Sequence, residues 1–475
     1  MNARSNPAFA RCRTRPVDSS ATVADVLVSL SRRSGAAVLE SSAPHQLDGR
    51  FSILACDPVH TLSVPTDHPA PLDALAAELA RFPVVAGPAT GPFCGGWIGY
   101  ISYETGLSVE GLRPTTRNDI DLPALRFTLY DTAGVFDHAA GRWQVVGVDW
   151  PGDSGIDRPA LDERLDDLSD LIASAQPAPE PDFTDPIGPA PTPNVTRREY
   201  LQAVDRVQAF IRTGDVYQVN FTQRFSTSTT TNPWDLYRRL RRANPAPFAA
   251  LLQWDDRAIL SASPELFLDL RGHRVITRPI KGTRPRTGDP GLDAIRRREL
   301  PASDKDRAEL AMIVDLLRND LGRVCRYGSV EVLASAELET HPTVYHLVGT
   351  VTGLLRARCD RMDLLKATLP GGSITGAPKI RAMQIIDALE PTCRSAYCGV
   401  IGYLGLDGSM ALNLAIRTMI QQGEHLHLFA GGGIVADSDP ADEYDESLAK
   451  AAGMMRALGH ETSSLAQLRQ VEAQP

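Results

Sequence analysis

Residues 430–451 read AGGGIVADSDPADEYDESLAKA and carry the densest local signal in the chain. They begin at the end of an apolar run, 426–430, that predicts a strand. The glycines after it would let backbone amides approach an anion, or could simply form a turn. A helix is predicted over 442–458, and it carries Glu443 and Glu446 three residues apart on one face.

A second acidic helix is predicted over 305–317, where Asp306 and Glu309 share a face. Solvated acidic faces are the common explanation for such carboxylates. If the two helices converge, their oxygens would instead suit Mg²⁺. The local pattern leaves both interpretations open.

Residues 278–284 read RPIKGTR. Lys281 follows a predicted strand, and Gly282 allows a ligand to approach the backbone. An exposed lysine at a strand end is the usual fate of this residue type. Arg278 and Arg284 would instead favour the neutral amine that a nucleophile needs, or would hold carboxylates of a substrate.

Residues 370–379 read PGGSITGAPK, with Pro378 at a predicted helix start. The GxxxxGK[ST] pattern of a P-loop is missing, yet small residues before a helix N-terminus can bind an anion. A tight structural turn is the alternative. His341 and His346 lie in HPTVYHLV, where a histidine before a strand is more often structural than catalytic.

The 475 residues correspond to about three domains of roughly 150 residues each. With 43% hydrophobic and 23% charged residues, the chain can fill a large core. A net charge of −9 argues against nucleic-acid binding, and no apolar run reaches the ~18–20 residues of a membrane span. Seven cysteines without CxxC spacing indicate neither zinc nor a disulfide framework, and favour a reducing, cytoplasmic location.

Seven prolines between residues 177 and 193 predict an extended connector, 177–195, because proline removes donors and fixes φ. It separates an N-terminal part, 1–176, from a C-terminal part, 196–458, which a polar tail, 459–475, follows. Arg4, Arg11, Arg13 and Arg15 precede any acidic residue and predict a frayed basic N-terminus rather than a targeting signal. Predicted strands lie at 36–40, 51–55, 125–129, 216–225, 258–261, 265–270, 275–277, 348–352, 399–404, 411–419 and 426–430, and further helices at 199–213 and 378–388.

Taken together, these segments closely resemble the chorismate-utilising enzymes. The matching motifs run in family order between about residues 214 and 450: PIKGT, DLLRNDLGR, HLV, PGGSITGAPK, YCGVIGY, AIRTM and the glycine and acidic stretch quoted first. VLES (38–41) and GGWIGYISYE (95–104) match more weakly. The resemblance implies an α+β fold, a large layered unit of packed β-sheets flanked by helices, in which both parts share one core.

Carried over residue by residue, the resemblance implies that Lys281 is a nucleophile, that Glu265 is an acid/base carboxylate and that His346 lies beside the reacting ring. Glu309 and Glu446 would bind Mg²⁺, with Asp306 and Glu443 near them. Chorismate would contact Gly282, Thr283, Tyr397, Arg417, Gly431, Gly432, Gly433 and Lys450.

Two positions distinguish the branches of the family. Gln218 stands where the branches that add water place a lysine base, which disfavours hydration. Lys281 stands where anthranilate synthases usually carry alanine, and its lysine is similar to the aminodeoxychorismate synthase component I branch. That branch implies amination of chorismate at C4 through a covalent Lys281 intermediate, giving 4-amino-4-deoxychorismate for p-aminobenzoate and folate biosynthesis. Anthranilate synthase component I and a non-catalytic chorismate-binding regulatory subunit are the alternatives.

The sequence shows no glutamine amidotransferase signature, so the resemblance implies that a separate glutaminase subunit supplies ammonia. VLES and 247–249 resemble segments that bind tryptophan in relatives, which makes the N-terminal part a candidate for a tryptophan pocket. Two positions depart from the family: Gly349, where relatives often carry serine, and Gln384, where they often carry glutamate.

Overall fold

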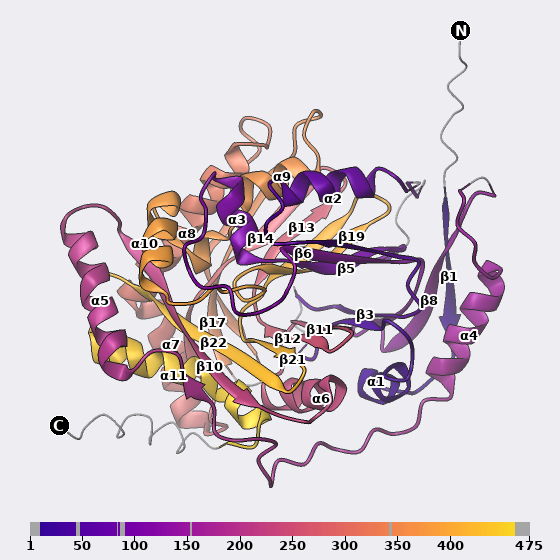
Figure 1. Cartoon of the computed structure of the whole chain (residues 1–475), viewed down its shortest axis with the longest axis horizontal. Coiled ribbons are helices and arrows are strands. Elements are labelled where there is room, and N and C mark those ends of the chain that lie inside the picture. The colour runs from indigo at the N-terminus through magenta and orange to yellow at the C-terminus, as the bar shows by residue number, and fades with distance from the viewer. Residues whose placement is uncertain are drawn as a thin grey trace.

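The computed structural model describes residues 10–43, 48–82, 84–85, 91–152, 154–341 and 344–460. Two large β-sheets flanked by helices make up the molecule (Figure 1). The pairings between the named strands are antiparallel. This architecture confirms the predicted α+β class with packed sheets. Most of the predicted polar tail, 461–475, lies outside the described residues.

The first sheet combines twelve strands from both halves of the chain. In order across the sheet they are β1 (Arg11–Val17), β8 (Arg142–Asp149), β7 (Thr132–Asp137), β3 (Phe51–Ala55), β2 (Ala37–Glu40), β11 (Phe248–Trp254), β12 (Arg257–Ser263), β21 (Thr418–Gln422), β22 (His425–Ile434), β10 (Gln218–Ser228) and β18 (Gly376–Ala377), and β9 (Thr192–Pro193) also pairs with β10.

The second sheet has ten strands, which also come from both halves of the chain. Its order is β15 (Ile280–Pro285), β17 (Val344–Leu354), β14 (Arg274–Arg278), β13 (Leu266–Arg271), β20 (Met410–Leu414), β19 (Val400–Gly405), β5 (Gly96–Ile101), β6 (Leu125–Tyr130) and β4 (His60–Val64), with β16 (Glu331–Thr340) on β17.

Helices lie outside the two sheets. They are α1 (Val23–Leu30), α2 (Pro71–Leu79), α3 (Tyr103–Val109), α4 (Leu161–Ala173), α5 (Arg197–Arg212), α6 (Pro233–Ala243), α7 (Pro290–Ala302), α8 (Asp304–Gly322), α9 (Arg361–Thr368), α10 (Lys379–Leu389) and α11 (Pro440–Ala457), with the short 3₁₀ helix η1 (Gly372–Ile374). The predicted capping box is present at α5, where Thr196 and Glu199 satisfy each other's backbone donors. None of the helices in the described ranges combines the length and apolar character that a membrane span needs.

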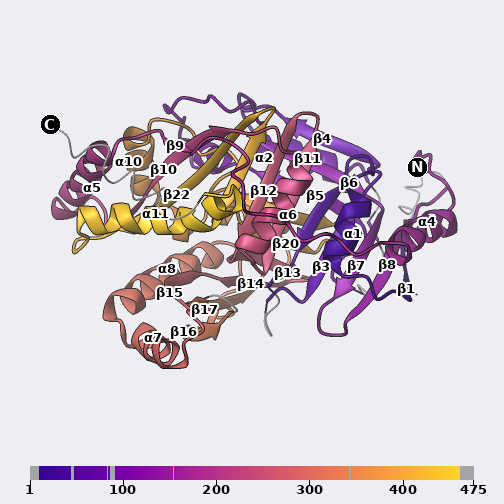
Figure 2. The same cartoon turned by 90° about the horizontal axis from the view of Figure 1, so that it is seen from below.

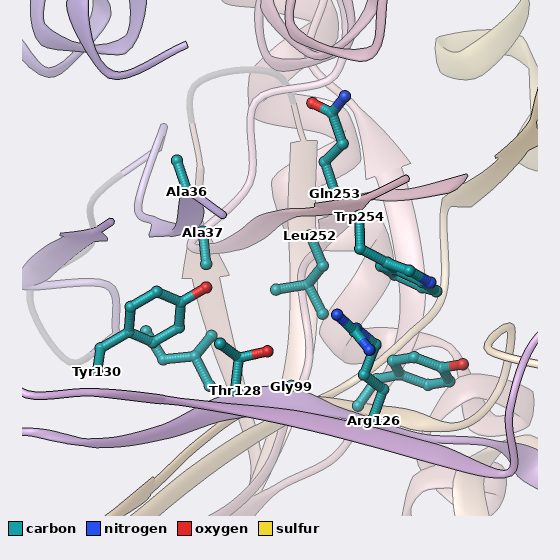
Figure 3. Close-up of a pocket in the computed structure, with 11 residues that line it drawn as sticks. Ala36, Ala37, Gly99, Arg126, Thr128, Tyr130, Leu252, Gln253 and Trp254 are labelled. Carbon is teal, nitrogen blue, oxygen red and sulfur yellow. The ribbon is translucent and has the colours of Figure 1, made fainter. Parts of the chain in front are cut away.

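The two sheets face one another across one apolar core. A small cavity of about 20 Å³ lies between β2 and β11 of the first sheet and β5 and β6 of the second (Figure 3). Arg126 extends from β6 toward Trp254, and its guanidinium carbon lies 5.0 Å from the centre of the indole ring. A space of this size admits about one water molecule. It contains none of the predicted site residues, so the chemistry lies elsewhere.

Strands from before and after the proline-rich segment pair directly in both sheets. Ala37 of β2 lies opposite Leu252 of β11, and Ile101 of β5 lies opposite Val400 of β19. Residues 174–191 form neither helix nor strand, and the chain then enters β9. Each half of the chain therefore supplies part of every layer.

The frayed N-terminus expected from the arginine run is wrong for residues 11–17. They form the edge strand β1, which pairs with β8 along its whole length. Arg13 and Arg15 make ion pairs of 2.5 Å and 2.7 Å with Asp162 and Asp166 of α4. These acidic partners lie about 150 positions further along the chain, so the local sequence could not reveal them. Arg4 lies outside the described residues.

Two predicted elements differ from the structure near the glycine-rich stretch. The single strand predicted over 411–419 is two strands, β20 and β21, which belong to different sheets. The chain crosses between the sheets at 415–417, where Arg417 has a φ of 51°. The turn considered at 430–434 is also wrong, because β22 continues through the glycines to Ile434 and pairs with β10.

Candidate active site

Lys281 lies beside an irregularity in β15. The pairing with β17 shifts register between Lys281 and Thr283, so one extra residue, Gly282, is inserted there. Gly282 has a φ of 73°, which side chains other than glycine's adopt only with strain. A Cβ atom on it would lie 2.8 Å from Leu300 Cδ1 and 2.9 Å from Asp306. The strand can therefore take this shape, and direct Lys281 toward α8, only with glycine at this position.

The Lys281 amine lies in a crowded and mostly buried environment. Its Nζ atom is 3.9 Å from Glu309 Oε2, and its side chain is 12% exposed. Burial lowers the pKa of Lys281, Glu309 raises it, and the nearby positive charge of Lys450 lowers it again. The net direction is downward, toward the neutral amine that can act as a nucleophile.

The cause of that shift differs from the one expected from the sequence. Arg278 and Arg284 were the predicted cations beside Lys281, but each is held by carboxylates of its own. Arg278 pairs with Glu339, and Arg284 pairs with Asp306 at 2.9 Å. Arg278 belongs to β14 rather than β15, and both guanidinium groups are held by these carboxylates, so closeness in sequence did not bring their charge to the amine.

Glu265 lies between β12 and β13 with its side chain buried. Ser373 Oγ donates a hydrogen bond of 2.6 Å to Glu265 Oε1. Burial raises the pKa of Glu265 to about 7, against the opposing effects of Ser373, Lys281 and Arg417. A carboxyl group with this pKa can both give and take a proton near neutral pH.

His346 and Arg417 complete this part of the site. His346 Nδ1 is 3.0 Å from Thr283 Oγ1, and burial lowers the pKa of His346 well below its usual value, with Arg417 adding to the effect. Burial also lowers the pKa of Arg417, while Glu265 opposes this. Within the described residues the Arg417 guanidinium has no hydrogen bond or ion pair, so it is suited to bind an anionic ligand.

The two predicted acidic helices converge on one place, which favours a shared site over two solvated faces. Lys305 of α8 lies 3.7 Å from Glu443 of α11, and the charge of Glu446 on α11 contributes to raising the pKa of Glu309 on α8. Figure 2 shows α11 beside the lobe formed by α7, α8, β15, β16 and β17. Asp306 points into the same region beneath Gly282, although it is already paired with Arg284.

The carboxylates of this cluster fit a divalent cation. Burial raises the pKa of both Glu309 and Glu443, whereas Lys450 lowers that of Glu446. Glu443 Oε2 is buried without a hydrogen-bond partner in the described part of the chain. Among the described residues, no three His, Cys, Asp or Glu side chains form a complete metal cage. Mg²⁺ commonly uses only one or two protein carboxylates together with substrate oxygens, so this arrangement suits it.

The three glycines of β22 allow side chains to lie against the strand. A Cβ on Gly432 would come within 2.9 Å of Glu443 Oε2, and a Cβ on Gly433 would overlap the Gln218 amide. Gln218 is fully buried, and both of its amide atoms lack partners among the described residues. Unsatisfied buried amides are rare in folded proteins, which makes Gln218 a second group that could receive a ligand.

Lys450 and Tyr397, both predicted to contact the substrate, contact other residues of the protein in this structure. Lys450 Nζ lies 2.7 Å from Glu446 Oε1 and donates a 2.9 Å hydrogen bond to the carbonyl of Gly431. Tyr397 is buried and stacks on Phe429 of β22, with ring centres 4.9 Å apart. Lys450 thus faces the carboxylate cluster, and Tyr397 packs behind the glycine strand.

The PGGSITGAPK segment serves the site through residues to which the sequence assigned no role. Its Ser373 holds Glu265, while its Lys379 donates a 2.6 Å hydrogen bond to Asp320 of α8. Lys305, beside Glu443, was also missed. It stands four residues before Glu309, a spacing that places both on one helical face, so this signal was available.

The two departures from the family have different consequences. Gly349 in β17 packs closely on α8, because a Cβ there would lie 2.7 Å from Val314 Cγ2. Gln384 is exposed on α10 and accepts a hydrogen bond of 3.3 Å from Arg381. Gly349 therefore touches the helix that carries Asp306 and Glu309, whereas the Gln384 side chain is exposed.

The predicted tryptophan pocket stays a prediction. Ser41 Oγ is buried without a partner among the described residues, and a Cβ on Gly49 would overlap it and lie 3.0 Å from Pro247 Cβ. A separate groove of about 610 Å³ beside α7 contains none of the predicted site residues.

The known proteins that resemble this chain point to one protein family. The family model described as chorismate binding enzyme matches residues 36–456. The chain is 41% identical to aminodeoxychorismate synthase component 1 of Klebsiella aerogenes, over 90% of this chain and 95% of that protein. It is 40% identical to anthranilate synthase component 1 of Streptomyces coelicolor, over 82% of this chain and 77% of that protein.

The fold gives the same result. Anthranilate synthase component I from Streptococcus pneumoniae matches with a TM-score of 0.74 and 34% identity, over 86% of this chain and 93% of that one. The family match spans strands of both sheets and every residue gathered around Lys281. The chain therefore belongs to the chorismate binding enzymes.

Proposed function

We propose that this chain is the synthase component of an aminodeoxychorismate synthase, which aminates chorismate at C4 to give 4-amino-4-deoxychorismate for p-aminobenzoate and folate biosynthesis. The observation that carries the proposal is the buried Lys281 amine, 3.9 Å from Glu309 and with its pKa lowered by burial. Relatives of the anthranilate branch are almost as similar overall, so total identity does not choose between the branches. An available lysine nucleophile supports the aminodeoxychorismate branch.

The first half of the proposed reaction uses Lys281 and Glu265. Neutral Lys281 Nζ forms a bond to C2 of the chorismate ring, both ring double bonds shift by one position and the C4–O bond breaks. Glu265, with a pKa of about 7, gives its proton to the departing hydroxyl, which leaves as water. Glu265 is then a carboxylate, and the substrate is held covalently on a positively charged Lys281 nitrogen.

The second half returns both residues to their starting state. Ammonia forms a bond to C4, both double bonds shift back and the C2–N bond breaks, which releases Lys281 as a neutral amine. The new C4 ammonium group loses a proton to the Glu265 carboxylate. The overall change is chorismate plus ammonia giving 4-amino-4-deoxychorismate plus water.

The remaining residues bind and orient a dianionic substrate. Arg417, which has no hydrogen bond or ion pair in the described part of the chain, would hold one carboxylate of chorismate. Glu309 and Glu446 would hold Mg²⁺, with Glu443 beside them. When bound, the ion would neutralise a substrate carboxylate. This explains how a protein with a net charge of −9 can bind an anion.

Ammonia would come from a separate glutaminase subunit. The proposal rests on the absence of an amidotransferase signature from this sequence and on the words "component 1" in the names of relatives. Ammonium salts would replace that partner in vitro.

The test combines a product assay with a lysine variant. The protein is incubated with chorismate, Mg²⁺ and ammonium, and products are separated by mass. Wild type should give 4-amino-4-deoxychorismate, and Lys281→Ala should lower C4 amination by about 100-fold or more, with any residual product shifted to C2. Lys366→Ala, which removes a surface lysine paired with Asp73, is the control and should behave as wild type.

Three outcomes would contradict the proposal. Anthranilate formed by wild type without an added lyase would assign the chain to the anthranilate branch. Unchanged C4 amination by Lys281→Ala would exclude covalent catalysis. A complete lack of turnover by wild type that still binds chorismate would favour a regulatory subunit. A substrate adduct on the Lys281 peptide, found by mass spectrometry, would support the covalent step directly.

The metal proposal has its own measurement. Calorimetric titration of the protein with MgCl₂ should show binding that Glu446→Gln weakens by about 10-fold or more, because one of few carboxylate ligands is lost. Glu163→Gln, on the surface of α4, is the matched control. Equal Mg²⁺ affinity of wild type and Glu446→Gln would exclude Glu446 as a ligand.

A further inference from the structure

A row of buried ionisable side chains leads away from Lys281 behind His346. Arg278 forms ion pairs with Glu339 and, at 3.4 Å, with Asp48. Glu339 Oε2 lies 3.2 Å from His341 Nε2. All four side chains are buried. We call Asp48, Arg278, Glu339 and His341 the buried brace.

Stability alone does not explain this arrangement. Moving a charged group out of water costs several kcal/mol, and apolar residues of similar size often replace a buried ion pair without loss of stability. The Nε atom of Arg278 is also buried without a hydrogen-bond partner in the described part of the chain. A role in holding a particular geometry therefore explains the brace better than a role in stability.

One end of the brace lies immediately before the segment that carries Lys281. Arg278 is the last residue of β14, and only Pro279 separates it from β15. Because Arg278 is fixed by two carboxylates, from the loop before β3 and from β16, the start of residues 279–283 is held against both.

The other end of the brace reaches the end of the same segment. Glu339 and Thr283 both lie opposite His346, on the two edges of β17. Thr283 Oγ1 is 3.0 Å from His346 Nδ1, and the rings of His341 and His346 are 5.3 Å apart at 64°. Directly opposed residues of paired strands have side chains on the same face, so these groups form one row across three strands.

We propose that the buried brace positions Lys281: it fixes residues 279–283 at both ends and so holds the bulge at Gly282 in the shape that directs the amine toward the substrate. The inference rests on the proposed function, because it assumes that the Lys281 amine must reach a reacting carbon. A displacement of about 1 Å of such a group can cost about 100-fold in rate. None of the brace residues needs to touch the substrate.

Asp48 connects the N-terminal part of the chain to the buried brace through its ion pair with Arg278. It precedes Gly49, which packs against Ser41 and Pro247, and among the brace residues it pairs with Arg278. Its loss should therefore have a smaller effect than loss of Glu339, which touches both Arg278 and His341.

The experiment compares Glu339→Gln with a matched buried variant. In Glu339→Gln the neutral amide keeps the shape but loses the charge pair with Arg278. Steady-state kinetics with chorismate should show kcat reduced by about 10- to 100-fold and KM changed by less than about threefold. Asp131→Asn removes an equally buried charge, paired with Arg158 and Arg164 far from β15, and should leave kcat unchanged.

A second measurement separates positioning from mere destabilisation. The rate at which acetic anhydride modifies Lys281 is followed by peptide mass spectrometry, well below the unfolding temperature. Glu339→Gln should change this rate and Asp131→Asn should not. If Glu339→Gln has the same kcat and the same rate of Lys281 modification as wild type, the proposal is overturned. If that variant does not fold, Asp48→Asn gives the same measurements, and wild-type values there would overturn it.

Failure of this inference differs from failure of the proposed function. If Lys281→Ala abolishes C4 amination while Glu339→Gln has no effect, only the brace is excluded. If Lys281→Ala retains full C4 amination, the covalent mechanism is excluded, and with it any reason to position the amine.

Discussion

At the scale of single residues, burial sets the protonation state of Glu265. Its carboxyl accepts a hydrogen bond from Ser373 and lies near Lys281 and Arg417, and all three lower its pKa. Desolvation is the larger effect and raises the pKa to about 7. Between pH 4.5 and 7 the folded chain therefore keeps a proton that the unfolded chain has released.

This difference predicts how Glu265→Gln changes stability. Because the native state binds the extra proton, wild type loses stability as pH rises from about 4.5 to 7, by up to about 3 kcal/mol. The amide has no charge to bury, so the variant should gain stability over wild type at pH 8 but not at pH 4.5. Urea unfolding at both pH values measures this. An equal stability difference at the two pH values would contradict it.

Glu265→Gln should also lower C4 amination by about 10²- to 10⁴-fold, because the departing hydroxyl loses its proton donor. For wild type, kcat should fall as pH rises above 7, since Glu265 must start protonated. A kcat that keeps rising above pH 8 would exclude Glu265 as the acid.

Gly282 offers a second test at this scale. Gly282→Ala adds backbone strain and a clash with Leu300 and Asp306, so we expect a loss of about 3 kcal/mol and of C4 amination. Gly272→Ala is the matched control: Gly272 has a φ of 57° but open space around it, so only the strain of about 1 kcal/mol should appear. If Gly282→Ala and Gly272→Ala lower the free energy of unfolding in urea by the same amount, the close packing at Gly282 is unimportant.

At the scale of elements, the distance between α8 and β17 depends on Gly349. α8 carries Asp306 and Glu309, and β17 carries His346, so this contact sets how the carboxylates face the rest of the site. Val314 of α8 packs directly on Gly349. The helix thus lies closer to the strand here than a side chain would allow.

Gly349→Ser should therefore push α8 away from β17. We expect a loss of about 1–3 kcal/mol from overpacking against Val314 and a reduced kcat. Adding Val314→Ala should restore part of both, with a coupling of about 0.5 kcal/mol or more in a double-mutant cycle. Additive losses would show that the two residues do not compete for space.

At the scale of the whole molecule, the N-terminal and C-terminal parts are interleaved. β2 pairs with β11, and β5 pairs with β19, so each sheet contains strands from both sides of the proline-rich segment. Figures 1 and 2 show indigo or purple strands from the start of the chain beside pink or orange strands from its later part. Neither part can bury its apolar faces without the other.

This interleaving predicts joint unfolding of the two parts. Trp143 lies in β8 of the N-terminal part and Trp254 in β11 of the C-terminal part. Two variants are compared, in which either Trp143 or Trp254 is the single remaining tryptophan of the five in the chain. Both should show the same urea midpoint by fluorescence, and the midpoint should match that from circular dichroism. Separate midpoints for Trp143 and Trp254 would show that the parts unfold independently.

Several features were predictable because their causes are local. The capping box at α5 and the apolar run of β3 each follow from neighbouring residues. The errors arose where partners are distant. The edge strand β1 depends on aspartates of α4, and the crossing at Arg417 depends on which sheet each flanking strand joins.

The sequence by itself determined the family motifs, the α+β class and the residue types available for chemistry, because these depend on identity and short-range spacing. Only the tertiary structure decided which carboxylates face one another, that Lys450 rather than Arg278 or Arg284 lies beside the Lys281 amine, and that Ser373 holds Glu265. The physical reason is that charge and burial act through distance in space. Antiparallel pairing of strands hundreds of residues apart sets those distances, and no local pattern encodes them.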